Sequence, residues 1–124
     1  MLIKSHRDLD VYQRSFEASM KVFELSKQFP KEERYSLTDQ VRRSSRSVSS
    51  QIAEAWHKRA YEAAFVSKLR DSCAEAAETQ TWLDYAVACK YADSANAVEL
   101  NLDYEALLRS LRGMIHNSEK WVES

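Results

Sequence analysis

Turn-forming residues are almost absent from this chain, which has one glycine and one proline among 124 residues. A β-sheet protein needs many tight turns, and these two residues form most of them. Alanine, glutamate, leucine, lysine, arginine and serine dominate instead, as is typical of long helices. The length suits one domain with one core. We therefore expect an all-α fold in which residues 1–124 form a single domain.

The segment at 36–59 combines a helical stripe with a run of serines. Positions in the stripe step by four and three residues, as on one face of a helix. They are Leu37, Val41, Ser45, Val48, Ile52 and Ala55. Serine is a middling helix former, but its small side chain lets a neighbouring helix approach closely. We expect a helix that ends near His57, with Ser36 as its N-cap and Asp39 as the acidic partner of a capping box.

Three further helices are expected, at about 8–28, 60–91 and from 103 onward. Pro30 ends the first, because the residue before a proline disfavours helical geometry. In the third, an apolar seam alternates steps of four and three, as in an antiparallel bundle. We expect residues 92–102 to form a loop and Asp103 to cap the last helix. Four helices with short links predict an antiparallel, up-down-up-down four-helix bundle.

The first helix carries two opposed apolar stripes, whereas the surface helix of a monomer needs only one. One stripe contains Leu9, Tyr12, Phe16, Met20 and Phe23, and the other contains Val11, Ala18, Val22 and Leu25. We expect one stripe in the core and the other against a second subunit. The alternative is a helix sandwiched within one chain. Large side chains also point away from the seam of the third helix. The expected subunit interface is Val11, Val22, Leu25, Trp82 and Tyr85.

Two positions break the helical patterns. Gln80 is polar within the seam of the third helix, where it fixes register, bonds across a subunit boundary or lies at the edge of the stripe. Gly113 falls inside the fourth helix, where it costs about 1 kcal/mol relative to alanine. We interpret it as a point of close contact with the small residues of the second helix.

Basic residues gather in the second helix and just after it, at Arg42, Arg43, Arg46, Lys58 and Arg59. Glu54 is the one acidic residue in 41–60, so this segment is basic in a chain whose formal net charge is −1. Such a patch suits non-specific contact with RNA or DNA phosphates. The alternative is ion pairing with acidic residues of the third helix or of a neighbouring subunit. Both interpretations stay open on the sequence.

No enzymatic site is expected. Glu54 and His57 form a Glu-x-x-His pair of the kind found in di-iron bundles, but such a site also needs a second pair and two further glutamates. The histidines lie on three separate segments, and a single glycine cannot form a phosphate-binding loop. We therefore expect no catalytic residue, no metal and no cofactor.

The sequence predicts a cytoplasmic protein that makes no membrane contact. No stretch has the roughly 18–20 apolar residues of a membrane span. The first ten residues lack the apolar run of a signal peptide. Cys73 and Cys89 fall on one predicted helix about 24 Å apart, which is too far for a disulfide. We expect both thiols to be reduced.

Three blocks of sequence match a known pattern: RDLDVYQRSFE at 7–17, FPKEERYSLTDQVRRSSRSVSSQIAEAWHKR at 29–59 and AETQTWLDYA at 77–86. They resemble the four helix bundle proteins, also called 23S rRNA intervening-sequence proteins. The resemblance covers most of the chain. Two positions depart from the family pattern, because Gln51 stands for an asparagine and Ala55 for a glycine. Where that glycine lets the helix end or bend, Ala55 favours its continuation.

The resemblance implies an antiparallel four-helix bundle that assembles into a ring-shaped homopentamer. It implies a family without established enzymatic activity, some of whose members are encoded within insertions in 23S rRNA genes. Relatives serve diversity-generating retroelements, where a pentamer binds nucleic acid and the reverse transcriptase. We therefore expect a homo-oligomeric accessory that binds RNA or DNA through its basic face. The alternative is a protein-binding scaffold whose basic residues serve subunit assembly.

Overall fold

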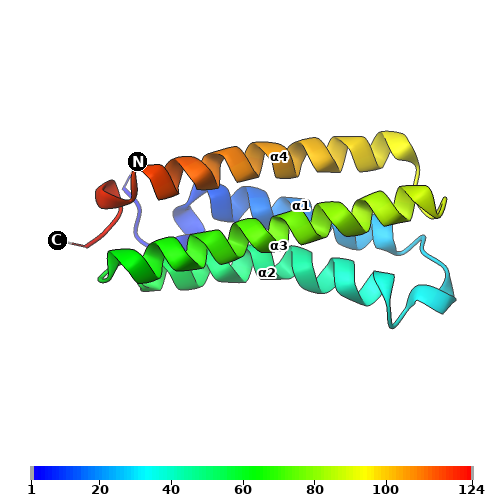
Figure 1. Cartoon of the computed structure of the whole chain (residues 1–124), viewed down its shortest axis with the longest axis horizontal. Coiled ribbons are helices and arrows are strands. Elements are labelled where there is room, and N and C mark those ends of the chain that lie inside the picture. The colour runs from blue at the N-terminus through cyan, green and yellow to red at the C-terminus, as the bar shows by residue number, and fades with distance from the viewer. Residues whose placement is uncertain (1, 124) are drawn as a thin grey trace.

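The computed structural model describes residues 2–123, which form four α-helices: α1 (Asp10–Ser26), α2 (Leu37–His57), α3 (Glu62–Ala88) and α4 (Ser94–His116) (Figure 1). Short 3-10 helices precede α1, α2 and the C-terminus: η1 (His6–Asp8), η2 (Lys31–Glu33) and η3 (Ser118–Lys120). Residues 2–123 contain no strand. None of the helices in this part of the chain is long and apolar enough to span a bilayer.

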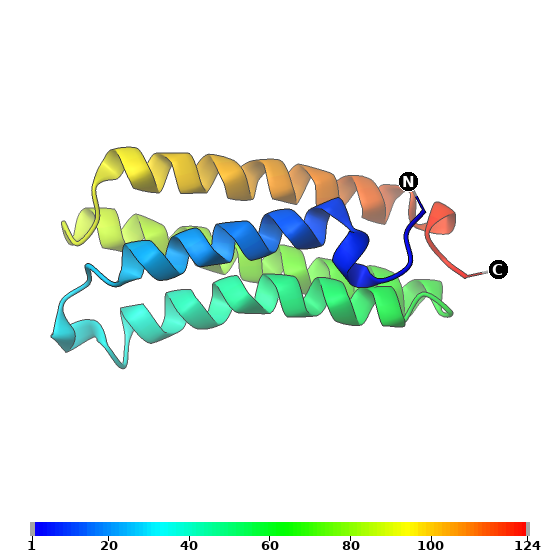
Figure 2. The same ribbon diagram turned by 180° about the vertical axis from the view of Figure 1, so that it is seen from behind.

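Each helix runs antiparallel to the one before it (Figure 1), and the view from behind shows the same order (Figure 2). Helix α1 packs on α2, α2 on α3 and α3 on α4, and α4 returns to α1. The α2–α3 contact is the most extensive and the α1–α4 contact is the least. The expected all-α, up-down-up-down bundle is confirmed.

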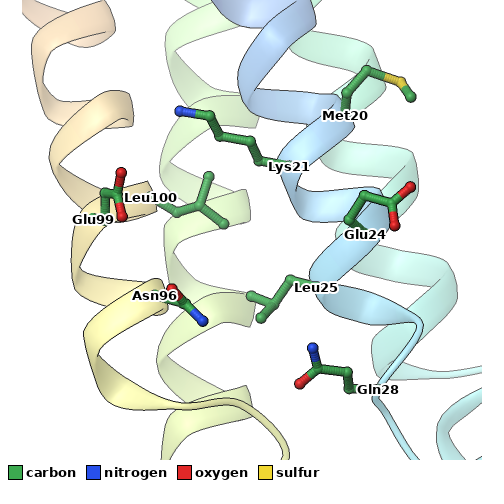
Figure 3. A pocket seen from close by; sticks show the side chains of 8 residues that line it. All are labelled: Met20, Lys21, Glu24, Leu25, Gln28, Asn96, Glu99 and Leu100. Atoms are coloured by element: carbon green, nitrogen blue, oxygen red, sulfur yellow. The ribbon is translucent and has the colours of Figure 1, made fainter.

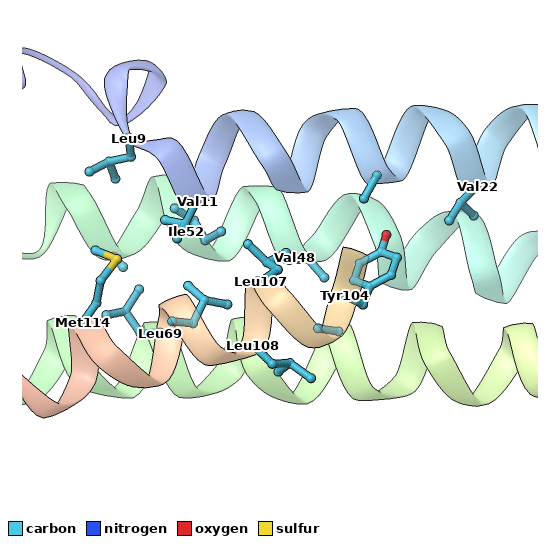
Figure 4. Close-up of a cluster of buried hydrophobic side chains, with 14 of the residues drawn as sticks. Leu9, Val11, Val22, Val48, Ile52, Leu69, Tyr104, Leu107, Leu108 and Met114 are labelled. Carbon is cyan, nitrogen blue, oxygen red and sulfur yellow. The ribbon is translucent and has the colours of Figure 1, made fainter. Parts of the chain in front are cut away.

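All four helices contribute to one hydrophobic core, part of which is drawn in Figure 4. Its largest fully buried side chains are Tyr104, Phe65, Ile52, Leu69, Leu83, Leu107 and Leu111. Burying one large aliphatic side chain contributes about 1.5–3 kcal/mol. Because serine-rich α2 has only moderate helix propensity, this burial is what holds it in the bundle.

The two stripes of α1 exchange the roles that the sequence suggested. Val11, Val22 and Leu25 are 4%, 1% and 6% exposed and belong to the core of the chain itself. Their prediction as subunit-interface residues is therefore wrong. In the opposite stripe Leu9 is buried and Tyr12 and Phe23 are half-buried, whereas Phe16 and Met20 face solvent and are 52% and 48% exposed. The valine stripe is the buried one for a steric reason. Small residues between Val11 and Val22 let α1 approach α2 closely, so this face packs into the core.

Ser36 is the N-cap residue of α2, as expected, but the capping box with Asp39 is wrong, because the Ser36 side chain makes no capping bond and Glu33 supplies the carboxylate. The Glu33 carboxylate accepts hydrogen bonds from the Ser36 hydroxyl and, at 3.2 Å, from the Leu37 N–H. It also accepts one from the Tyr91 hydroxyl at 2.9 Å. These bonds, that of Ser36 foremost, lower the pKa of Glu33. The bond to Glu33 raises the pKa of Tyr91 to about 12.

Helix α4 begins at Ser94, so the predictions of a loop at 92–102 and of a cap at Asp103 are both wrong. Asp93 is the N-cap, and its carboxylate accepts a backbone hydrogen bond from the first turn at 2.8 Å. Ala97 and Leu100 in this first stretch are buried in the bundle, and this packing outweighs the low helix propensity of its asparagines. Asp103 lies within the helix and pairs with Lys21 of α1 at 3.1 Å.

The two positions that break the helical patterns have different outcomes. The Gln80 side-chain amide donates to the Asn101 carbonyl and to the Glu105 carboxylate, each at 3.4 Å. These contacts join α3 to α4 within one chain rather than across a subunit boundary. Gly113 is exposed, and a Cβ added there would meet nothing within 4 Å. Its interpretation as a close contact with α2 is therefore wrong.

Candidate nucleic-acid interface

Ser44, Ser45 and Ser49 of α2 are buried against the neighbouring helices, and the arginines lie on the outer surface of α2. The Ser45 hydroxyl accepts a hydrogen bond from Ser19 of α1 at 3.1 Å. The hydroxyls of Ser44 and Thr79 of α3 lie 2.8 Å apart. Ser44 thus faces α3 and Ser45 faces α1. The positions that flank them on the same turns of α2 therefore point outward. The expectation that small residues bring the helices close is confirmed.

The outward side chains line a shallow depression of about 640 Å³, which we call the arginine notch. Its lining residues are Arg34, Thr38, Asp39, Arg42, Arg43, Arg46, Ser47 and Ser50. Positions 38, 42, 46 and 50 follow a spacing of four, which places their side chains along one side of α2, and Arg34 extends this side from the segment before the helix. Asp39 is the one carboxylate in this lining. The depression is therefore basic.

An aromatic ring of α1 holds two of these arginines in place. The guanidinium carbons of Arg42 and Arg46 lie 4.8 and 5.9 Å from the centre of the Phe23 ring. The Arg42 Nε also donates to the Ser26 hydroxyl at 2.7 Å. Within residues 2–123 neither arginine forms an ion pair. Their terminal N–H groups are therefore available to an anion, and a guanidinium binds phosphate well.

Arg43 has carboxylate partners within the chain. One terminal nitrogen lies 3.3 Å from the Glu75 carboxylate of α3, and the other pairs with Glu78. The Trp82 indole N–H also donates to Glu78, at 3.2 Å. The expected ion pairing with the third helix is confirmed for Arg43. The charge of Arg43 is largely neutralised, so it contributes less to the notch than the other arginines.

Lys58 and Arg59 lie apart from the notch, at the far end of α2. The Arg59 guanidinium lies 3.5 Å from the centre of the Trp56 ring and pairs with Glu123 at 3.2 Å. It also donates to the Trp121 carbonyl at 3.4 Å, so it fastens the C-terminal segment to α2. Lys58 is exposed. The predicted basic cluster is thus divided between the two ends of α2. Arg42 and Arg46 are the members that line the notch and form no ion pair within residues 2–123.

Sequence reasoning missed Arg34 and the hydroxyl groups of the notch. Thr38 is 8% exposed, and its hydroxyl has no hydrogen-bond partner in the described part of the chain. Arg34 is exposed and precedes α2. Thr38 lies four residues before Arg42 on the same helix, so this spacing could have found it. Arg34 lies outside the predicted helix, and no helical spacing pointed to it.

Glu54 and His57 do not converge with further metal ligands. Glu54 is exposed and lies 3.8 Å from the Lys68 ammonium. The His57 Nε2 lies 3.3 Å from the Nδ1 of His6. Burial, followed by the charges of Arg7 and His57, lowers the pKa of His6. Within residues 2–123, no three His, Cys, Asp or Glu side chains form a cluster suited to a metal ion.

Another hollow of about 570 Å³ lies between α1 and α4. Figure 3 shows Leu25 and Leu100 in the space between these helices. The rim carries the carboxylates of Glu24 and Glu99 as well as the ammonium of Lys21. Because these charges are of both signs, the hollow is less suited to a polyanion than the arginine notch.

Comparison with known proteins identifies a family and several similar solved structures. The family described as 23S rRNA-intervening sequence protein matches residues 7–113. A crystal structure of a protein with unknown function, of the S23 ribosomal protein family from Bacteroides thetaiotaomicron, is similar with a TM-score of 0.77. It is 26% identical, and the match covers 85% of this chain and 97% of that one. No curated protein matches.

Proposed function

The chain belongs to the 23S rRNA-intervening sequence protein family, and from this premise we propose that it is a non-enzymatic accessory protein that binds nucleic acid through the arginine notch. The single observation that carries the proposal is the state of Arg42 and Arg46. Both side chains are oriented by Phe23, and neither forms an ion pair within residues 2–123. A phosphate can therefore bind these two guanidinium groups without first displacing a carboxylate from them.

The character of the notch supports contact with a nucleic-acid backbone rather than with bases in a groove. Arginine and hydroxyl side chains are the groups that most often contact phosphate oxygens, and such contacts carry no sequence information. Each phosphate neutralised releases counterions, so affinity falls steeply with salt. The proposed activity is therefore salt-sensitive binding of RNA or DNA with little sequence preference.

We include self-assembly in the proposal, with a homopentamer as the expected state. Trp82 and Tyr85 support it, because Tyr85 is 55% exposed and both side chains line an apolar hollow of about 390 Å³. A ring of copies joined head to tail uses two different surfaces of each chain. Repetition of the notch around such a ring multiplies a modest affinity through avidity.

The second candidate function is a protein-binding scaffold in which the notch serves subunit assembly. Arg43 is the observation that favours it, because two carboxylates of α3 already bind this arginine. A carboxylate of a neighbouring subunit could bind Arg46 in the same way. In that case, removing Arg46 dissociates the oligomer and leaves no nucleic-acid affinity to lose.

Light scattering of the purified chain, with and without a structured RNA at about 50 and 200 mM salt, tests both candidates. The proposal predicts a pentamer-sized particle that binds RNA at low salt and releases it at high salt. A pentamer indifferent to RNA at both salts would favour the scaffold. A monomer would contradict the self-assembly that both candidates share. The Arg46→Ala variant then shows whether this arginine affects particle mass or RNA binding.

A further inference from the structure

A second hollow adjoins the arginine notch, in the surface between α1 and α2. It measures about 490 Å³ and is lined by Tyr12, Phe16, Met20 and Phe23 of α1 and by Arg46 and Ser50 of α2, among others. We call it the aromatic groove. Arg46 and Ser50 line both the groove and the notch. The two hollows are therefore one continuous surface, aromatic on one side and cationic on the other.

The aromatic side of this surface is accessible. Phe16 is 52% exposed and Met20 48% exposed. The Tyr12 ring lies 6.2 Å from the Phe16 ring, at an interplanar angle of 36°. Phe23, at the other end, is the ring against which the guanidinium of Arg46 lies. Phe23 lies about two helical turns beyond Phe16 along α1, so a ligand on Phe16 is close to the guanidinium of Arg46.

We propose that the aromatic groove takes an unpaired base of a single-stranded nucleic acid whose phosphate lies in the arginine notch. This inference rests on the proposed function and names its substrate class. Bases of a duplex are stacked inside it and cannot reach a protein groove, whereas unpaired bases can be splayed out and stacked on aromatic side chains. Aromatic surfaces beside a basic track are the combination that binds single strands.

The dimensions and chemistry of the groove fit this occupant. Tyr12 and Phe23 lie about 16 Å apart along α1, at about 1.5 Å per residue. That length accommodates an unpaired segment rather than a single small anion. The positive wall at Arg46 complements a phosphate-bearing ligand. An apolar helix of a second copy would instead have to cover this charge, which costs free energy unless a carboxylate accompanies it.

The test compares a single-stranded oligouridylate with a duplex RNA of equal length, both at low salt. The variants are Phe16→Ala, the conservative Phe16→Tyr, and Tyr61→Ala as a matched control. Tyr61 is 73% exposed and lies outside the groove. We expect the wild type to prefer the single strand. Phe16→Ala should lose about 5- to 150-fold in single-strand affinity, the usual range for one stacked base. Phe16→Tyr and Tyr61→Ala should bind like the wild type.

The possible outcomes separate this inference from the proposed function. If wild type binds neither RNA, the proposed function fails, and the inference fails with it. If wild type binds both RNAs equally and Phe16→Ala changes neither affinity, phosphate contact stands and base stacking is overturned. If Phe16→Ala changes the particle mass instead of RNA affinity, the groove is a subunit interface and the inference is overturned.

Discussion

The hydroxyl oxygens of Ser15 and Ser49 lie 2.9 Å apart in the closed interior between α1 and α2. Ser15 is fully buried and also donates to the Tyr12 carbonyl, so both hydroxyls have partners. This pair shows why α2 can carry so many serines. They satisfy one another across the helix contact while their small size keeps the two helices close. The same contact brings Phe23 of α1 beside the arginines of α2.

Enlarging Ser15 should destabilise the bundle, because Ser15 is fully buried where α1 packs on α2. We expect Ser15→Leu to lower the free energy of unfolding by about 1–3 kcal/mol, as overpacking of a core usually does. Urea denaturation measures the change. Ser67→Leu is the matched control, because Ser67 is exposed on α3 and should change stability by no more than about 0.5 kcal/mol. Equal effects at both positions would contradict the close contact.

Tyr104 is fully buried, and its hydroxyl has no hydrogen-bond partner within residues 2–123. Burial, with a smaller contribution from Asp103, raises the pKa of Tyr104. An unsatisfied buried hydroxyl costs about 1–3 kcal/mol, so Tyr104→Phe should leave stability unchanged or increase it. Because the folded pKa is raised, the wild type should also lose stability as pH rises above about 10, and Tyr104→Phe should lose less. A destabilised Tyr104→Phe variant in urea denaturation would contradict this assignment.

Gly113→Ala should stabilise the protein, because Gly113 lies in α4 without a left-handed backbone and an added Cβ meets nothing within 4 Å. The expected gain is about 0.5–1 kcal/mol, from helix propensity and reduced entropy of the unfolded chain. Thermal and urea unfolding measure it. A loss of stability would indicate that a subunit contact approaches this position.

Glu33 should make stability depend on acid pH. Its pKa is lowered chiefly by the Ser36 hydroxyl, so its contribution is present above the ordinary carboxyl pKa and is lost as pH falls through the lowered value. We expect Glu33→Ala to be less stable than wild type at neutral pH, with the difference shrinking as pH falls below the ordinary carboxyl pKa and through the lowered one. Glu32→Ala, an exposed neighbour, is the control. A difference that is constant with pH would contradict the capping role.

The sequence predicted the helical bundle because apolar spacing reports burial directly, as at Ile52, Leu83 and Leu107. It was less successful with helix caps, where a residue outside the expected motif decides the outcome. Ser36 is the N-cap residue of α2, as expected, but the carboxylate that caps the helix is that of Glu33 rather than Asp39. Tyr91, which follows α3, also donates to Glu33. The loop prediction at 92–102 failed because local propensity was outweighed by packing that only the fold creates.

Part of the candidate interface could also be predicted from the helical spacing of residues in the sequence. Helical periodicity places Arg43 and Arg46 opposite the apolar stripe of the second helix, with Arg42 to one side. The sequence alone could not show that Arg43 pairs with two carboxylates of α3. Nor could it show that Phe23 of α1 lies against Arg42 and Arg46. The aromatic groove was missed entirely, because its aromatic and basic residues lie on different helices.

The most direct test of the central claim is the salt dependence of RNA affinity for wild type, Arg42→Ala, Arg46→Ala and the exposed control Arg109→Ala of α4. Each lost phosphate contact should lower the magnitude of the slope of log affinity against log salt by about 0.7–0.9. We predict that drop for Arg42→Ala and Arg46→Ala and no change for Arg109→Ala. Equal slopes for all four proteins would contradict binding through the arginine notch.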